Sequence, residues 1–369
     1  MNLEGRIDIQ LKTRGVAPAT VAIQSSRPQL AQKLLGGRAP EEAAHLAGLI
    51  FSLCGKAQRV AAKAACEAAS GVMPAAAVSR ARETAVLLEL AQEHAWRFLL
   101  DWPQQQGMPP DQAGQSRLRQ SAADPTHFLE TLDELLRTTL LGEAADVWLA
   151  RGLAGFDAWR HAGATATARL FAGLGEGADI GISQAGPLPP LAILEDAEAH
   201  ELARRALDEP AFCGQPLWRG APAETGALAR MREQPLLAAW IAQRGCGAGA
   251  RLLARLLELT ELPARLAECS AGILAGSIWV RAWPLSNNTG LAGVETARGL
   301  LFHVARLREG KVEQYRIVAP TEWNFHPAGP LCQALAGLAP GDGLDARARL
   351  VAQSLDPCVA FGIEVSEAR

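Results

Sequence analysis

The strongest constraint on the fold is a series of long segments in which apolar residues recur three and four positions apart. In one of them, Leu129, Leu132, Leu136 and Leu140 fall on one helical face. Because an α-helix turns once in about 3.6 residues, this spacing is typical of helices that bury one side. The same pattern predicts helices at about residues 40–53, 57–70, 79–102, 128–151, 226–243, 247–269, 330–337 and 345–354.

Two other stretches alternate apolar and polar residues, as strands do. Residues 4–24 predict a small β-element near the N-terminus. Residues 300–318 predict a hairpin, because alternating segments flank the turn sequence Glu309-Gly310. Alanine and leucine are abundant and aromatic residues make up 5% of the chain, which favours helix elsewhere. The expected fold class is therefore mainly α (α+β).

The composition limits the classes of function. The chain has 369 residues, of which 49% are hydrophobic, and a net charge of −3 that gives no basic field for nucleic acid. No apolar run reaches the roughly 20 residues that cross a bilayer, and the polar segment 1–9 lacks the apolar core of a secretion signal. We expect a cytoplasmic protein of one domain, residues 1–369, mostly helical over 41–290 and ending in a C-terminal segment at 330–364.

Two of the seven cysteines stand out by their context. Cys358 follows an Asp356-Pro357 turn signal, and Cys54 directly precedes Gly55, where we expect a break or a close approach of two backbones. The two cysteines are 304 residues apart (358 − 54). Cysteine is a soft metal ligand, so they form a candidate metal site if the fold brings them together. The other cysteines show no metal or disulfide spacing, and we expect them to be small buried side chains.

A set of short motifs also follows one order along residues 4–364. The motifs are Glu4-Gly5, Gly37-Arg38-Ala39-Pro40, Cys54-Gly55-Lys56-Ala57, Asp101-Trp102, Glu224–Arg230, Glu295–Gly299, Pro320–Asn324 and Asp356-Pro357-Cys358. In this order they resemble the large, catalytic subunit of nickel–iron hydrogenases. Each motif is weak alone, but the shared order indicates common descent. The resemblance implies the same fold, a helical bundle with small β-elements near the N-terminus and around residues 300–318.

The departures from that family bear on function. The family uses two cysteine pairs, and the second cysteine of each pair bridges nickel and iron. The matching positions here are Ala57 and Phe361, which cannot ligate a metal. A proton-transfer glutamate of the family is matched by Gln32, and two of its histidines by Ala61 and Glu364. The resemblance therefore implies that no nickel–iron centre forms and that the protein is not an enzyme.

What remains is one cysteine of each pair and the groups that face the iron's cyanide and carbonyl ligands in the family. By resemblance these groups are Arg298 and Pro320-Thr321, with Glu295 in support. Buried cyanide needs hydrogen-bond donors. The combination is similar to hydrogenase accessory proteins of the HupK/HoxV type. It implies a maturation scaffold that holds or hands on an Fe(CN)₂(CO) fragment through Cys54 and Cys358, without nickel. The implied partners are other maturation proteins and the immature large subunit.

Other interpretations stay open at this point. The retained cysteines match the family's terminal nickel ligands, so an iron fragment would have to sit displaced toward them. Cys54 and Cys358 are alternatively inherited relics in a metal-free chaperone of the immature large subunit. A divergent hydrogenase-like enzyme subunit is a third interpretation, which Ala57, Phe361 and Gln32 together disfavour. For Arg298, the simpler interpretation is an ion pair with Glu295 or another acid.

Overall fold

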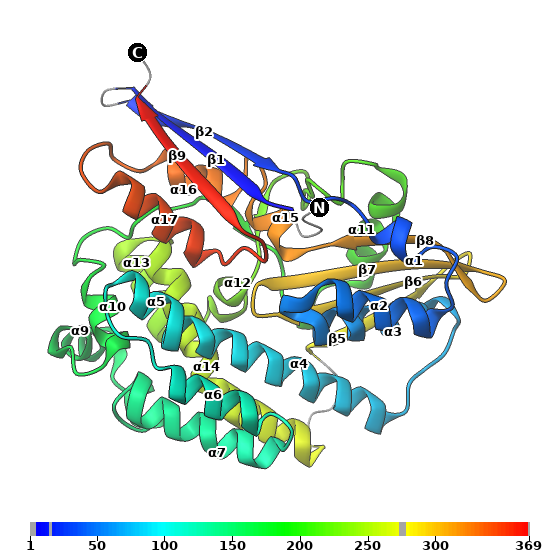
Figure 1. The fold of residues 1–369 in the computed structure, drawn as a ribbon, viewed down its shortest axis with the longest axis horizontal. Helices are drawn as coiled ribbons and strands as arrows, with labels where there is room; N and C mark the ends of the chain where they lie inside the picture. The colour runs from blue at the N-terminus through cyan, green and yellow to red at the C-terminus, as the bar shows by residue number, and fades with distance from the viewer. Residues whose placement is uncertain (1–4, 15–16, 273–277, 368–369) are drawn as a thin grey trace.

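The computed structural model describes residues 5–14, 17–272 and 278–367. Figure 1 shows a helical body with one sheet beside it and a second sheet formed by the two ends of the chain. The helices are α1 (Ala31–Leu35), α2 (Pro40–Ile50), α3 (Gly55–Ala69), α4 (Ala76–Trp96), α5 (Trp102–Gln105), α6 (Gln112–Ser121), α7 (Pro125–Leu135), α8 (Ala145–Leu149), α9 (Gly152–Ala162), α10 (Ala166–Ala172), α11 (Asp196–Asp208), α12 (Ala227–Met231), α13 (Pro235–Arg244), α14 (Ala248–Ala271), α15 (Pro320–Asn324), α16 (Pro330–Ala336) and α17 (Leu344–Ser354).

Short turns of other helix types and nine strands complete the described elements. The former are the 3₁₀ turns η1 (Ser52–Cys54) and η4 (Leu191–Ile193) and the π turns η2 (Arg97–Asp101) and η3 (Leu136–Leu140). The strands are β1 (Ile7–Arg14), β2 (Ala17–Ser25), β3 (Gly186–Pro187), β4 (Ala223–Glu224), β5 (Val280–Leu285), β6 (Thr289–Thr296), β7 (Gly299–Arg308), β8 (Lys311–Val318) and β9 (Phe361–Glu367).

The helical body is built around the contact between α4 and α14, with α6 and α7 beside them (Figure 1). The leucines of α14 that the sequence pattern assigns to its buried face, among them Leu252 and Leu256, are fully buried there. Burial of such side chains is the main favourable contribution to folding, at about 1.5–3 kcal/mol each. Two of the charged residues described below lie on this helix pair, Glu93 on α4 and Arg255 on α14.

A four-stranded antiparallel sheet, in the order β5-β6-β7-β8, is covered on both faces. Leu301 packs with the alanine-rich α3 on one face, whereas Leu300 and Phe302 pack with α11 on the other. A Cβ atom at Gly290 of β6 would lie 2.2 Å from the carbonyl oxygen of Ala65. Only a glycine opposite small side chains permits so close an approach, which explains why α3 carries so many alanines.

The two ends of the chain meet in a three-stranded sheet of order β2-β1-β9 (Figure 1). β1 pairs with β2 antiparallel and with β9 in parallel, where Ile7 lies opposite Phe361. The helices α16 and α17 cover the apolar side of this sheet. The pairing fixes the loop before β9, which carries Cys358, close to the N-terminal part of the chain.

The expected class is confirmed, but several elements differ from the sequence prediction. The segment 103–123, expected as a loop, contains α6, and the expected helix 128–151 is interrupted after η3. Strands β5, β6 and β9 were not expected. Residues 4 and 15–16 of the predicted β-element 4–24 lie outside the described residues, and the single-domain assignment stays a prediction. In the described ranges, none of the helices combines the length and apolar character that crossing a bilayer requires.

Candidate functional site

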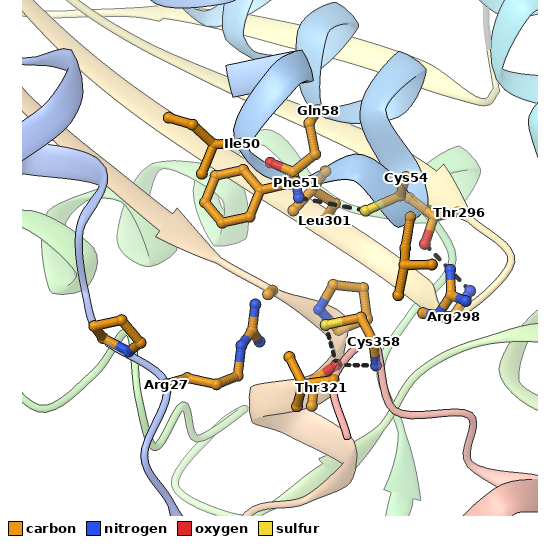
Figure 2. A pocket seen from close by; sticks show the side chains of 15 residues that line it. Arg27, Ile50, Phe51, Cys54, Gln58, Thr296, Arg298, Leu301, Thr321 and Cys358 are labelled. Carbon is orange, nitrogen blue, oxygen red and sulfur yellow. Dashed lines mark hydrogen bonds between the residues drawn. The ribbon is translucent and has the colours of Figure 1, made fainter. Parts of the chain in front are cut away.

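Cys54 and Cys358 line the same pocket, as the sequence comparison predicts (Figure 2). Its empty volume, open solvent included, is about 670 Å³. Cys54 is the last residue of η1, and Cys358 lies in the loop between α17 and β9. The other lining residues are Arg27, Pro28, Ile50, Phe51, Leu53, Gln58, Thr296, Arg298, Leu301, Ala319, Pro320, Thr321 and Val359.

The backbone around Cys54 is fixed by two contacts. A Cβ atom at Gly55 would lie 2.6 Å from the carbonyl oxygen of Gly48, so the close approach expected at Gly55 is confirmed. At the start of α3, the backbone N–H groups of Lys56 and Ala57 donate to the carboxylate of Glu89 on α4, at 2.8 and 2.9 Å. Glu89 therefore occupies the helix N-terminus next to Cys54 and satisfies donors that the helix leaves unpaired.

The Cys54 thiol accepts a hydrogen bond from a neutral side chain. Gln58 Nε2 donates to Cys54 Sγ at 3.6 Å, and Gln58 Oε1 lies 2.9 Å from Nε2 of the buried His303. Burial raises the pKa of the Cys54 thiol to about 12, with a further contribution from Cys358 that Arg298 partly offsets. The free thiol is therefore protonated at neutral pH.

Cys358 is held by Thr321, the second residue of α15. Thr321 Oγ1 donates to Cys358 Sγ at 3.0 Å, and the Cys358 N–H lies 3.4 Å from the same oxygen. Pro320 occupies the first position of α15, where its missing N–H costs nothing. Two residues before Cys358, Asp356 has a positive φ of 54°, which turns the chain toward the pocket. The resemblance pointed to Thr321 as a neighbour of the site, and the structure makes it the partner of one thiol.

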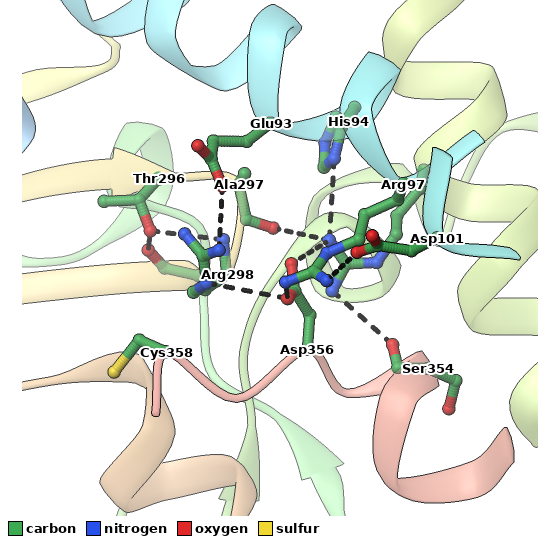
Figure 3. A network of polar contacts seen from close by, with 12 residues as sticks. Glu93, His94, Arg97, Asp101, Thr296, Ala297, Arg298, Ser354, Asp356 and Cys358 are labelled. Atoms are coloured by element: carbon green, nitrogen blue, oxygen red, sulfur yellow. Dashed lines mark hydrogen bonds and ion pairs between the residues drawn. The ribbon is translucent and has the colours of Figure 1, made fainter. Parts of the chain in front are cut away.

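Arg298 joins the pocket to a cluster of buried charges (Figure 3). Its Nη2 donates to Glu93 at 2.7 Å, and its Nε lies 3.6 Å from Asp356 Oδ1. Asp356 also pairs with Arg97 and, at 3.2 Å, with Arg255. Although burial opposes it, these arginines, Arg298 first, hold the pKa of the Asp356 carboxyl well below its usual range. Arg298 Nε is buried and has no hydrogen-bond acceptor among the described residues.

Glu295, which was expected to support the site, makes its hydrogen bonds with residues outside the thiol pocket. Its Oε2 accepts from Arg230 at 2.7 Å and its Oε1 from the Leu191 N–H at 2.8 Å. It is not among the residues that line the pocket. The ion pair considered for Arg298 therefore exists, but with Asp356 and Glu93, because the turn at Asp356 brings that carboxylate beneath the guanidinium.

The positions that match the family's missing ligands contribute no metal-binding atom to the pocket. Ala57 and Ala61 are buried in the core between α3 and the four-stranded sheet. Phe361 begins β9 and lines a neighbouring hollow that shares Cys358 with the pocket. Gln32 is not at the pocket either, because its Oε1 accepts from the Tyr315 N–H at 2.7 Å and ties α1 to β8.

The sequence analysis missed Arg27 as a second cation of the pocket. Its side chain points into the pocket from the connector before α1, and 12% of it is exposed (Figure 2). Arg27 Nη1 donates to Glu322 at 2.8 Å across a separation of 295 residues. No local pattern signals such a contact, since the connector has no periodicity. The described residues contain no cluster of three or more His, Cys, Asp or Glu that could hold a metal.

Comparison with known proteins gives the chain its relatives. Residues 241–363 match the family described as nickel-dependent hydrogenase. The hydrogenase expression/formation protein HoxV of Cupriavidus necator is 34% identical over 94% of this chain and 93% of its own length. The hydrogenase expression/formation protein HupK of Rhizobium leguminosarum bv. viciae is also 34% identical, over 99% of this chain and 97% of its own.

Solved structures agree on the fold. The Ni-Fe-Se hydrogenase of Desulfomicrobium baculatum superposes with a TM-score of 0.59, covering 94% of this chain and 95% of that one, at 16% identity. So low an identity shows the fold alone. The sequence relatives decide the family, because they match at 34% identity over nearly the full length. This chain belongs to the family of hydrogenase expression/formation proteins that includes HoxV and HupK.

Proposed function

We propose that this protein serves hydrogenase maturation in the cytoplasm as a non-catalytic holder of an Fe(CN)₂(CO) fragment, with Cys54 and Cys358 as its ligands. The observation that carries the proposal is that two cysteines 304 residues apart (358 − 54) line one pocket. The relatives HoxV and HupK are named hydrogenase expression/formation proteins, which supports the process. The proposed partners are other maturation proteins and the immature large subunit.

The lining of the pocket suits such a cargo. Thiolates are soft ligands and match a low-spin iron that already carries cyanide and carbonyl. Cyanide nitrogen accepts hydrogen bonds, and the buried guanidinium of Arg298, which lines the pocket, supplies a charged donor group. Apolar side chains such as Phe51 and Leu301 form another part of the lining, where a carbonyl ligand needs no polar contact.

The same lining favours release. Two single thiolates hold a metal less firmly than the four of the hydrogenase family. Thiols must lose their protons when a metal binds, and burial raises the pKa of Cys54 to about 12. Loading therefore has to displace a tightly held proton, and reprotonation of Cys54 helps the fragment to leave. Arg298 remains paired with Asp356 throughout and keeps the anionic fragment oriented.

The non-catalytic part of the proposal rests on the two missing bridging ligands. Ala57 lies inside an apolar core and Phe361 in a strand, so neither offers a lone pair to a second metal. A nickel ion next to iron would lack the bridging thiolates that the hydrogenase family uses. The protein therefore carries one metal fragment rather than a hydrogen-activating centre.

Infrared spectroscopy tests the proposal. The protein is purified anaerobically from cells that make the hydrogenase, and its cyanide and carbonyl stretching bands are recorded. We expect bands in the wild type, none in Cys54→Ala or Cys358→Ala, and unchanged bands in the control Cys332→Ala. Cys332 is also a half-buried free thiol, but it lies outside the pocket.

The metal-free alternative gives a different result. If the protein acts through contacts alone, the wild type shows no bands under conditions in which a known iron-carrying accessory protein does. Both cysteine variants then still support hydrogenase maturation in the cell. That pair of outcomes contradicts the proposed cargo while leaving the role in maturation intact. Hydrogen uptake by the isolated protein would contradict the non-catalytic assignment.

A further inference from the structure

The pocket holds two guanidinium groups, placed on different sides of the two thiols. Arg298 enters from the turn between β6 and β7, and Arg27 from the connector between β2 and α1 (Figure 2). Both line the pocket together with Cys54 and Cys358. The two arginines come from parts of the chain that are 271 residues apart (298 − 27), so the fold and not a local motif creates the arrangement.

Arg27 interacts electrostatically with both cysteines when their thiols are ionised. Burial lowers the pKa of its guanidinium, but Cys358, Glu322 and Cys54 act against this, and the net effect is to raise it. The cation is therefore permanent, and it is close enough to both sulfur atoms to respond to their charge. Arg298 responds to the same two thiols, after the larger effects of burial, Asp356 and Glu93.

Glu322 neutralises Arg27 from outside the pocket. It accepts from Arg27 Nη1 at 2.8 Å, but it lines a neighbouring hollow together with Arg27 and Thr321 rather than the thiol pocket itself. No carboxylate and no imidazole is among the described residues that line the thiol pocket. A ligand between the two cysteines therefore meets positive charge on two sides and, apart from the cysteines themselves, no negative side chain among the described lining residues.

This lining is unfavourable for a bare divalent cation. Zinc in proteins takes about four ligands, usually thiolates, imidazoles or carboxylates, and here the pocket offers two. Two fixed guanidinium groups would repel the ion in addition. An anionic complex meets the opposite situation, because it brings its own ligands and those ligands accept hydrogen bonds from both arginines.

We propose that Arg27 and Arg298 make the thiol site selective for metals that arrive as anionic complexes with small ligands already bound, and that they exclude bare divalent ions. In this account Arg27 is a specificity-determining residue. The inference deepens the proposed function, on which it rests for the identity of the natural cargo. The selectivity itself follows from the charges of the pocket and holds for any small anionic complex of a thiol-binding metal.

The probe is dicyanoaurate(I), an anionic complex of a soft metal with two cyanide ligands. The full-length protein is titrated anaerobically with dicyanoaurate and, separately, with zinc ion, and binding is followed by calorimetry and by the cyanide stretching band. We expect one of the two thiols to replace one cyanide of dicyanoaurate, which leaves as HCN with the thiol proton, so that an anionic thiolate–gold–cyanide unit remains in the pocket. Binding should be lost when Cys54→Ala and Cys358→Ala are combined, and zinc ion should bind these thiols at least tenfold more weakly. Arg27→Gln should weaken dicyanoaurate about tenfold or more and leave zinc binding equal or stronger.

Two further variants separate charge from folding. Arg27→Lys keeps the charge and should keep most of the preference for dicyanoaurate. Glu322→Gln removes the negative charge that neutralises Arg27 and should strengthen dicyanoaurate binding. Arg6→Gln, at an exposed arginine that pairs with Asp8, is the matched control and should change nothing. Thermal unfolding of each variant checks that the fold is retained.

The proposal is overturned if Arg27→Gln weakens zinc and dicyanoaurate equally, if it weakens neither, or if wild-type protein binds zinc through these thiols more tightly than dicyanoaurate. The result is separable from the test of the proposed function. Absence of native infrared bands together with Arg27-dependent selectivity for dicyanoaurate would reject the iron cargo and keep the charge selection. Native infrared bands without Arg27-dependent selectivity would support the iron cargo and reject the charge selection.

Discussion

Cys54 and Cys358 reach the same pocket from opposite ends of the chain, and a carboxylate fixes the backbone beside each of them in a different way. Beside Cys54, Glu89 accepts two backbone N–H groups at the start of α3. Beside Cys358, Asp356 is buried among Arg97, Arg255 and Arg298. One side of the pocket thus depends on a helix cap and the other on a buried ionic cluster.

The Cys54 side and the Cys358 side of the pocket should therefore respond to different substitutions. A change of charge near α4 and α14 moves the Cys358 side, because the position of Asp356 depends on three cations. The Cys54 side depends on the hydrogen bonds of two backbone N–H groups to Glu89 and of Gln58 to the thiol. The two thiols also have different hydrogen-bond donors, since the Thr321 hydroxyl donates to Cys358 and the Gln58 amide donates to Cys54.

The largest effect is expected from Asp356→Asn, which leaves three arginines without their shared anion. Loss of one partner of a buried ion pair costs about 3–5 kcal/mol, so the free energy of unfolding should fall by that amount in urea titrations at pH 7. Asp101→Asn is the control, since Asp101 shares Arg97 but is partly exposed, and it should cost less than about 1 kcal/mol.

The pH dependence of the unfolding free energy gives a second measurement of the ion pairs of Asp356. Asp356 has a lowered pKa in the folded protein, so its contribution is present above the unfolded pKa of about 3.9 and is lost as the pH falls below it. The stability difference between wild type and Asp356→Asn should therefore shrink below about pH 4. Equal losses of unfolding free energy in Asp356→Asn and Asp101→Asn would show that the buried ion pairs of Asp356 do not stabilise the Cys358 side.

The Cys54 side is tested by the pH dependence of its alkylation. Because only the thiolate reacts and the pKa is raised to about 12, the rate with iodoacetamide should rise about tenfold for each pH unit between pH 7 and 10. Mass spectrometry of the Cys54 peptide measures the rate, and the chain unfolded in urea is the control. An alkylation rate that levels off near pH 9 in the folded protein would show that the pKa of Cys54 is not raised.

Glu89→Gln should have a smaller effect on stability. The amide keeps one oxygen acceptor in place of two and loses the charge at the helix N-terminus, which should cost about 1 kcal/mol. Since Glu89 contributes to the raised pKa of Cys54, alkylation of Cys54 at pH 8 should become faster. The exposed Glu42 gives the control variant Glu42→Gln. An unchanged alkylation rate would mean that the cap and the thiol are independent.

The smallest effect is expected from Thr321→Val, which removes one hydroxyl from the Cys358 side and keeps the shape. Loss of its hydrogen bonds to Cys358 should cost about 0.5–1 kcal/mol. A double-mutant cycle with Cys358→Ala measures the coupling between the two side chains by urea unfolding. A coupling energy of zero would show that Thr321 does not hold this thiol.

Much of the fold could be predicted from the sequence, because its elements follow local rules. The leucine spacing located α14 and the turn at Glu309-Gly310 located the hairpin of β7 and β8. The helix α6 was missed because Leu118 is its one buried large apolar residue, although Asp111 caps it through the Gly114 N–H at 2.8 Å. Strand β9 was missed because its partner β1 lies at the other end of the chain.

The candidate site was predicted only in part, because some of its contacts join distant segments of the chain. The motif order identified Cys54, Cys358 and Arg298, which do line one pocket. It could not supply the partner of Arg298, since the choice of Asp356 over Glu295 depends on a turn with positive φ. Arg27 carries no local signal at all, because its role arises from a contact between distant segments.

X-ray absorption at the iron edge tests most directly whether both cysteines hold the same fragment. Protein purified anaerobically from hydrogenase-producing cells should show two sulfur ligands per iron together with short iron–carbon distances. Cys54→Ser and Cys358→Ser should each lower the sulfur count to one or abolish iron binding. An iron with no sulfur ligand, or a sulfur count unchanged by either variant, would contradict the account.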